Sequence, residues 1–268
     1  MSGWGGAGFS ERRVPAGRLA SEQKIGMGVL FVLAVGLVAG IISGIVGTGS
    51  SIMLVPVLAA VYGPKAAVPI MAVAAVMANV SRVLAWWQAV DRRAFAAYAV
   101  PGALAAAAGA RTLLVLPARA VDLAIGAFLL AMIPARHWLA RHLVRLNLVH
   151  LALGGAVIGF LTGIVVSTGP ISVPLFVAYG LSKGAFIGTE AAGSFAVYAS
   201  KTLTFQGAGA LPMAELAKGL VVGASLMAGA FLAKPFVLRL SPERFRVLMD
   251  GLMLLAGLSM IWSGLVPA

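Results

Sequence analysis

Two short polar stretches interrupt long apolar runs, and their residue types are suited to binding an anion. They read Gly47-Thr48-Gly49-Ser50-Ser51 and Ser167-Thr168-Gly169, and each is followed by a short apolar segment. The first turn of a helix has unpaired N–H groups and a partial positive charge, and glycine lets a ligand approach the backbone closely. Serine and threonine hydroxyls add further donors. We therefore expect one anion-binding site built from both stretches; in the alternative interpretation these side chains only cap their own helices.

Two cations occupy matching positions within the apolar runs. Ser81-Arg82 recurs 119 residues later as Ser200-Lys201. A charged side chain within a membrane is energetically unfavourable and is therefore a functional candidate, so either cation could attract the anion. In the alternative interpretation each side chain extends to the membrane surface. The sequence favours this alternative for Arg82, because Trp86 and Trp87 follow it and are typical of a membrane interface.

One acidic side chain, Glu190, is predicted inside the apolar run 184–206. A buried carboxylate that gains and loses a proton can couple movement of an anion to a proton gradient, so Glu190 is our candidate for proton coupling. Lys201 follows it by eleven residues, a rise of about 16 Å along a helix, which is too far for a direct ion pair. In the alternative interpretation Glu190 lies at the membrane interface near Lys183.

The overall composition is that of a membrane protein. Hydrophobic residues make up 61% of the chain and charged residues 10%, with a mean hydropathy of +1.01, whereas soluble domains carry about 25% charged residues. The net charge of +12 suits contact with anionic lipid head groups. The cations are scattered among short loops, so they do not indicate nucleic-acid binding.

Patterns typical of catalysis or metal binding are missing from the sequence. Cysteine is absent, which excludes disulfides and thiolate metal sites, and the three histidines are not spaced as ligands. No Ser/His/Asp arrangement, phosphate-binding lysine loop or dinucleotide-binding glycine pattern occurs. We therefore expect no metal, no cofactor and no enzymatic activity.

A glycine pattern indicates an internal duplication. Gly36, Gly40 and Gly44 are repeated 119 residues later as Gly155, Gly159 and Gly163, and in both copies they precede a polar break. Glycines four residues apart lie on one face of a helix and allow close helix packing. Packing alone does not explain why both copies break at the same place. A repeated, interrupted apolar segment is instead typical of a transporter's binding site.

These patterns predict an all-α polytopic membrane protein, with about eight transmembrane helices in two homologous four-helix repeats, each with a Gly-interrupted half-helix. The predicted spans are 25–46, 66–89, 94–110, 120–137, 148–165, 184–206, 213–233 and 245–265. The segments 50–62 and 169–179 are too short to cross a membrane. We expect a disordered polar tail at 1–24, repeat 1 at 25–137, a polar joint at 138–147 and repeat 2 at 148–268.

The chain resembles the sulfite exporter TauE/SafE family of membrane transporters over about residues 28–265. The resemblance rests on Gly40, Gly44, Gly47 and Gly49 ahead of the half-helix with Pro56, and on the second copy from Thr168-Gly169-Pro170 to Gly180. It rests also on AFIGTEAAG and the later Lys201. This chain has Ser50 and Ser51 where the family usually has further glycines. The resemblance implies transport of a small sulfur-containing oxyanion or an organosulfonate.

We therefore expect a multi-pass transporter of the bacterial inner membrane, which exports or imports such an anion through a central site. The expected binding residues are those of the two breaks together with Arg82 and Lys201. An uncoupled anion channel or facilitator is the alternative, and a membrane-embedded enzyme is a third. The expected partners are the anionic substrate and membrane lipids, with a homo-oligomer as a further option.

Overall fold

The computed structural model describes residues 16–46, 49–142, 145–165, 168–181, 183–233 and 242–265. Within these ranges the chain folds into helices and contains no β-strand. In chain order the helices are α1 (Ala16–Val46), α2 (Ser50–Tyr62), α3 (Pro64–Trp86), the 3-10 helix η1 (Trp87–Ala89), α4 (Arg92–Val115), α5 (Ala118–His142), α6 (Leu148–Ile164), α7 (Gly169–Ala178), α8 (Lys183–Gly207), α9 (Met213–Ala233) and α10 (Pro242–Leu265).

The predicted segments agree closely with these helices, and the two short segments predicted as half-helices are α2 and α7. Three boundaries differ from expectation by five residues or more. The helix α4 continues to Val115, whereas the span was predicted to end at 110. The helix α1 begins at Ala16, inside the tail predicted to be disordered, and α5 continues to His142, inside the predicted polar joint. Residues 16–24 and 138–142 are rich in Ala, Arg, Leu, Glu and Lys, which favour helix, so each apolar helix extends into its polar flank.

Local signals explain where several helices begin. The helix α2 follows Gly49, whose φ of 109° is in the left-handed region that glycine adopts readily. The side chain of Asp91 accepts hydrogen bonds from the N–H groups of Arg93 and Ala94 at the start of α4. Asn147 caps α6 through the N–H of His150.

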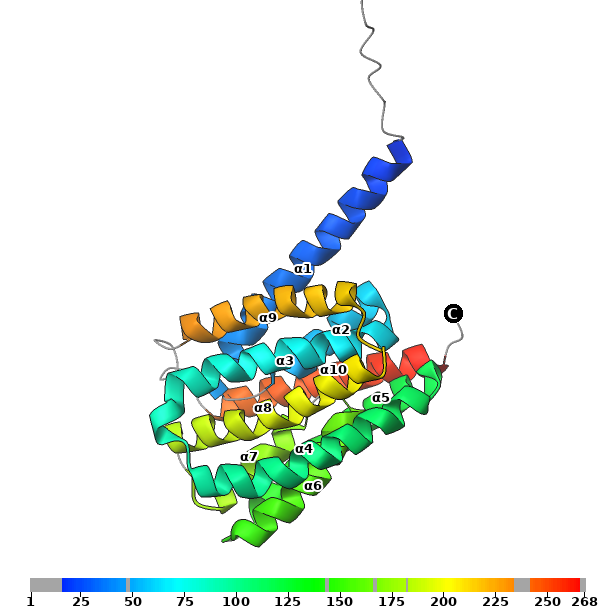
Figure 1. Cartoon of the computed structure of the whole chain (residues 1–268). Helices are drawn as coiled ribbons and strands as arrows, with labels where there is room; N and C mark the ends of the chain where they lie inside the picture. The colour runs from blue at the N-terminus through cyan, green and yellow to red at the C-terminus, as the bar shows by residue number, and fades with distance from the viewer. Residues whose placement is uncertain are drawn as a thin grey trace, which may run out of the picture.

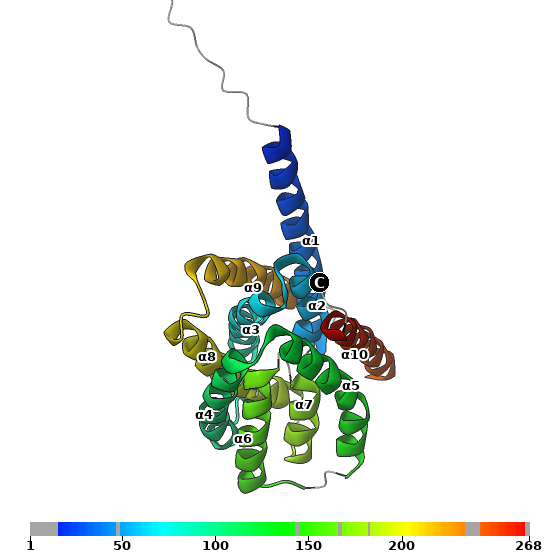
Figure 2. The same cartoon turned by 90° about the vertical axis from the view of Figure 1, so that its right-hand side faces the viewer.

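Four helices form a layer in the order α9, α3, α8 and α4 (Figure 1). The helix α1 packs against α9, and α6 packs against α4. The half-helices α2 and α7 contact α3 and α8 respectively, and α5 lies beside α10 (Figure 2). Segments far apart in the sequence are therefore neighbours throughout the fold.

The repeated glycines lie where helices approach most closely. A Cβ atom on Gly40 of α1 would lie 2.9 Å from the Cα of Leu226 in α9, and one on Gly159 of α6 would lie 2.7 Å from the Cα of Gly102 in α4. Only glycine permits such contact between backbones. The expected role of these glycines in helix packing is confirmed.

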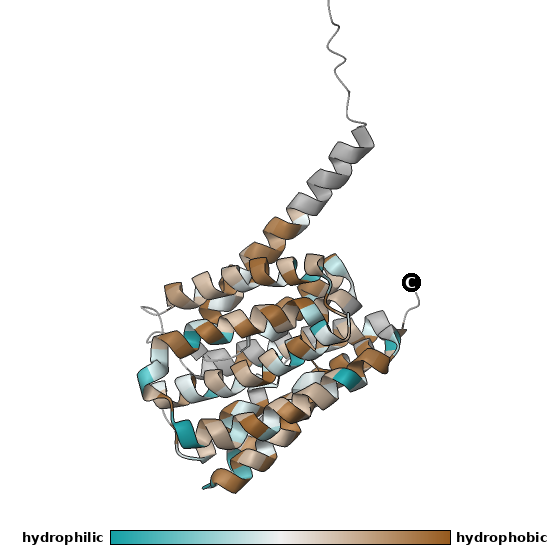
Figure 3. Ribbon diagram, in the orientation of Figure 1, coloured by the Kyte–Doolittle hydropathy of each residue, from teal (hydrophilic) through white to brown (hydrophobic). Residues whose placement is uncertain are grey.

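Five of the described helices are long and apolar enough to cross a membrane: α1, α3, α4, α5 and α9, over 27–44, 66–89, 92–115, 119–139 and 213–233. Figure 3 shows that apolar residues occur along much of the length of these helices. The helix α8 is not among the five, although it has 25 residues, and it carries the charged Glu190 and Lys201. Because α8 lies between α3 and α4, protein surrounds these charges.

Candidate functional site

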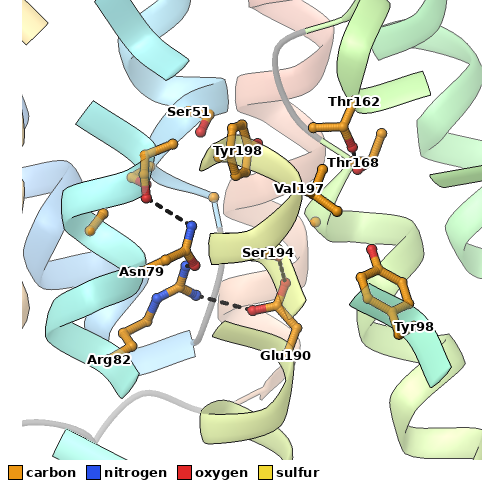
Figure 4. A pocket seen from close by; sticks show the side chains of 15 residues that line it. Ser51, Asn79, Arg82, Tyr98, Thr162, Thr168, Glu190, Ser194, Val197 and Tyr198 are labelled. Carbon is orange, nitrogen blue, oxygen red and sulfur yellow. Dashed lines mark hydrogen bonds and ion pairs between the residues drawn. The ribbon is translucent and has the colours of Figure 1, made fainter. Parts of the chain in front are cut away.

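A small cavity lies where the two breaks meet (Figure 4). Its volume is about 20 Å³, room for about one water molecule. Six helices contribute to its walls. The lining residues are Gly49, Ser50, Ser51, Ala75, Ala78, Asn79, Arg82, Tyr98, Thr162, Thr168, Gly169, Glu190, Ser194, Val197 and Tyr198.

The first turns of α2 and α7 both reach this cavity. Gly49, Ser50 and Ser51 line it from one break, and Thr168 and Gly169 line it from the other. The two breaks therefore meet at one cavity. Thr168, at the N-cap position of α7, makes no side-chain cap hydrogen bond, so capping does not explain this residue.

The hydroxyl of Thr168 instead pairs with that of Thr162, near the end of α6. Thr162 also donates to the carbonyl oxygen of Ile158, at 2.7 Å, which leaves the Thr168 hydroxyl as the donor between the two threonines. Both threonines are buried. This contact links the end of α6 to the start of α7 across the break and presents hydroxyl oxygens to the cavity.

Arg82 of α3 and Glu190 of α8 form a buried ion pair at the cavity (Figure 4). Arg82 Nη1 lies 3.3 Å from Glu190 Oε2, and the two side chains are 9% and 3% exposed. Snorkelling of Arg82 is therefore wrong, and Glu190 is buried within the protein. The physical reason is that α3 and α8 pack side by side, so each charge has an opposite charge within the protein.

The Glu190 carboxylate accepts two further hydrogen bonds. Its Oε1 receives the hydroxyl of Ser194, at 2.8 Å, and that of Ser172, at 3.1 Å. Ser194 lies one turn away on α8, whereas Ser172 lies in the first turn of the half-helix α7. Donors from α3, α7 and α8 thus converge on one carboxylate.

The Arg82 guanidinium is only partly satisfied. Nη2 donates to the side-chain oxygen of Asn79, and Nη1 donates to Glu190. Nε is buried and has no hydrogen-bond partner. Asn79 is held in place because its Nδ2 donates to the carbonyl oxygen of Ala75, at 2.8 Å. A buried cation with an unused donor therefore lines the cavity.

The model of the sulfite exporter TauE/SafE family matches residues 32–260. The chain belongs to this family. The search of curated proteins and the search of solved structures each found no match. Membership agrees with the helical fold and the five apolar helices, so this TauE/SafE protein is a multi-pass membrane transporter.

In this TauE/SafE protein the second predicted cation, Lys201, is not among the residues that line the cavity. Its side chain is fully buried, and Nζ donates to the carbonyl oxygens of Thr162, at 2.6 Å, and Val165, at 2.8 Å. The ring centroid of Phe205 lies 5.5 Å from Nζ. Within the described ranges Lys201 forms no ion pair with a carboxylate. The ammonium group therefore satisfies carbonyls at the end of α6, where the helix dipole is negative.

The structure thus separates the predicted site residues into three groups. Those at or on the cavity are Gly49, Ser50, Ser51, Thr168, Gly169, Arg82 and Glu190. Lys201 does not line the cavity and instead contacts carbonyl oxygens at the end of α6. Gly47, Thr48 and Ser167 lie outside the described residues.

Three residues that hydrogen bond to Arg82 or Glu190 in this TauE/SafE site were missed in the sequence: Asn79, Ser172 and Ser194. Asn79 and Ser194 had a detectable signal, because they lie three residues before Arg82 and four residues after Glu190, on the same helix faces. Ser172 had no such signal, because it lies on α7 whereas its partner Glu190 lies on α8.

Proposed function

We propose that this protein transports a small sulfur-containing oxyanion or an organosulfonate, and that the anion binds in the cavity between the two breaks. The observation that carries the proposal is the position of Arg82. Its guanidinium is buried beside the first turns of both half-helices and keeps an unused donor there. A planar guanidinium and helix N-termini are both suited to oxyanions.

The proposed binding groups complement one another. Arg82 supplies the full positive charge, and the starts of α2 and α7 supply N–H groups and partial positive charge. Ser51 and Thr168 supply hydroxyl groups. The tetrahedral or pyramidal oxygens of a sulfonate or sulfite can accept from donors on several sides at once, which matches a site with walls from different helices.

We also propose that the chain comprises two homologous repeats with eight full spans and two half-helices. The packing supports this, when α1–α5 are matched in order with α6–α10. The contact between α1 and α9 then corresponds to that between α6 and α4, and the contact between α3 and α9 corresponds to that between α8 and α4. The pairs α3 with α8 and α5 with α10 correspond to themselves, as a pseudo-twofold axis requires.

This arrangement supports transport by alternating access, in which one repeat rocks against the other around the central site. A cavity of about 20 Å³ has no room for a sulfonate, so the structure represents a closed form that has to open. We propose the bacterial inner membrane as its location. An uncoupled anion facilitator with the same site is the second candidate; Glu190 favours the coupled transporter, because a facilitator needs no titrating group.

The test is uptake by the purified protein in liposomes, with radiolabelled sulfite and a panel of short alkanesulfonates. We expect Arg82→Gln to abolish uptake. Arg111→Gln is the matched control, because Arg111 is an exposed arginine on α4 and should be dispensable. Uptake of none of these anions by the wild-type protein, or normal uptake by Arg82→Gln, would refute the proposal. Accumulation against a concentration gradient separates the coupled transporter from the facilitator.

A further inference from the structure

The carboxylate of Glu190 occupies the place that a transported oxyanion would need. We propose that Glu190 is a tethered competitor of the substrate: it holds Arg82 in the empty site, and Arg82 becomes available to the anion only when Glu190 takes up a proton. One proton would then enter the site with each anion. This inference rests on the proposed function, because it assumes that Arg82 binds the anion.

The contacts of Glu190 are those expected for a bound oxyanion. Its two oxygens accept hydrogen bonds from a guanidinium, from a hydroxyl in the first turn of α7 and from a hydroxyl of α8. A carboxylate is itself a small oxyanion with one negative charge. The site is therefore already built to hold such a group, and Glu190 supplies it from within the protein.

The ion pair with Arg82 has the geometry of a contact that can be exchanged. It uses one nitrogen and one oxygen, 3.3 Å apart, instead of two parallel hydrogen bonds. A bidentate arginine–carboxylate pair is stronger and more specific in geometry than a pair with a single contact. Here the Nε atom of Arg82 has no partner. An incoming oxyanion could engage Nε together with an Nη atom.

Protonation would release Arg82 without leaving Glu190 unsatisfied. A neutral carboxyl group has one donor and remaining acceptor capacity, and a serine hydroxyl can donate or accept. Ser172 and Ser194 could therefore continue to bind protonated Glu190. The guanidinium would keep its contact to Asn79 and gain the anion as its new partner.

Glu190 is the acidic residue among those that line the cavity, so its charge is the one that has to change when an anion binds. The titratable residues that line the cavity with it are Arg82 of α3, Tyr98 of α4 and Tyr198 of α8. The half-helix α7 and η1 contain no titratable residue, and α6 contains only the exposed His150. Lys201 lies on α8 but is engaged by two carbonyls at the end of α6. An anion added beside ionised Glu190 would leave two negative charges on one guanidinium, which proton uptake prevents.

The experiment measures equilibrium binding of methanesulfonate, whose charge does not change between pH 5 and 9, to the purified full-length protein. For the wild type we expect the affinity to fall as the pH rises, by up to about tenfold per pH unit, because one proton binds with each anion. Glu190→Gln removes the competing charge and keeps the shape. We expect it to bind methanesulfonate at least tenfold more tightly than the wild type at high pH, with no dependence on pH.

Two further variants complete the design. Glu190→Asp keeps the charge but shortens the side chain, so we expect the pH dependence to remain; it also serves if Glu190→Gln does not fold. Glu215→Gln is the matched control, because Glu215 of α9 pairs with Lys218 and does not line the cavity. It should bind like the wild type at every pH.

Outcomes against the inference differ from those against the proposed function. Weaker binding by Glu190→Gln than by the wild type, or the same pH dependence in both, would overturn the inference while the wild type still binds the anion. Wild-type affinity that does not change with pH would overturn it equally. If Glu190→Gln binds methanesulfonate and the wild type does not, the inference is supported, because the wild-type carboxylate then excludes the anion completely. If no variant binds methanesulfonate or sulfite, both the inference and the proposed function are refuted.

Discussion

Substitution of Gly163 by alanine tests whether α6 is positioned by direct contact with α4. A Cβ atom on Gly163 would lie 2.7 Å from the backbone nitrogen of Ala110 and 2.7 Å from the Cα of Gly109. The carbonyl oxygen of Ala106 would lie nearest, at 2.5 Å. Ordinary van der Waals contact begins at 3.4 Å, so the helices would have to separate by about 0.9 Å, the difference between these two distances. Backbone atoms cannot rotate away as a flexible side chain can.

Such overpacking destabilises a protein by about 1–3 kcal/mol. Alanine also favours helix over glycine by about 0.8–1 kcal/mol, which partly offsets the clash. Gly251→Ala isolates the clash, because Gly251 lies inside α10 and a Cβ atom there would meet nothing within 4 Å. The difference in stability between the two variants should therefore be about 1–3 kcal/mol, with Gly163→Ala the less stable.

The assay is thermal unfolding of both purified variants in the same detergent. One kcal/mol corresponds to about 2–4 °C for a chain of 150–250 residues, so we expect the two melting temperatures to differ by about 2–12 °C. Gly163→Ala should also transport more slowly, because the neighbouring Thr162 contacts both Thr168 and Lys201. Equal melting temperatures for the two variants would refute the close-packing account.

Three further predictions concern the site itself. Arg82→Gln should reduce uptake more than Lys201→Gln, the reverse of the order that the sequence favoured, because only Arg82 lines the cavity; initial rates in liposomes compare them. Lys201→Met leaves two buried carbonyls without donors, at about 1–3 kcal/mol each, and should lower the melting temperature by several degrees. Glu190→Gln should keep counterflow between equal pools and lose accumulation driven by a pH gradient; undiminished accumulation would exclude Glu190 as the coupling group.

The helices and their breaks could be predicted from the sequence because they depend on local properties. Apolar runs of sufficient length, ended by glycine and hydroxylated residues, indicated α2 and α7 as half-helices at their observed positions. The 119-residue offset predicted that the two breaks would share one site, and in the structure both breaks line one cavity. The extension of α1 and α5 into polar residues was missed, because helix propagates through residues that favour it.

The partners of the buried charges could not be predicted in this way. Arg82 and Glu190 are 108 residues apart, and no pattern in either segment identifies the other. The proximity of Trp86 and Trp87 indicated a membrane interface, yet Arg82 turns into the protein because Glu190 lies within reach on α8. The equivalent Lys201 meets carbonyls instead of a carboxylate, so matching positions in the sequence acquired different partners.

The sequence by itself determined that this protein lies in a membrane, that two glycine breaks interrupt its helices and that hydroxyl groups and helix N-termini gather there. These properties follow from composition, periodicity and the backbone freedom of glycine. Only the tertiary structure decided which cation faces the cavity and which carboxylate neutralises it. That choice depends on which helices lie side by side, and packing of α3 against α8 brings Arg82 and Glu190 together.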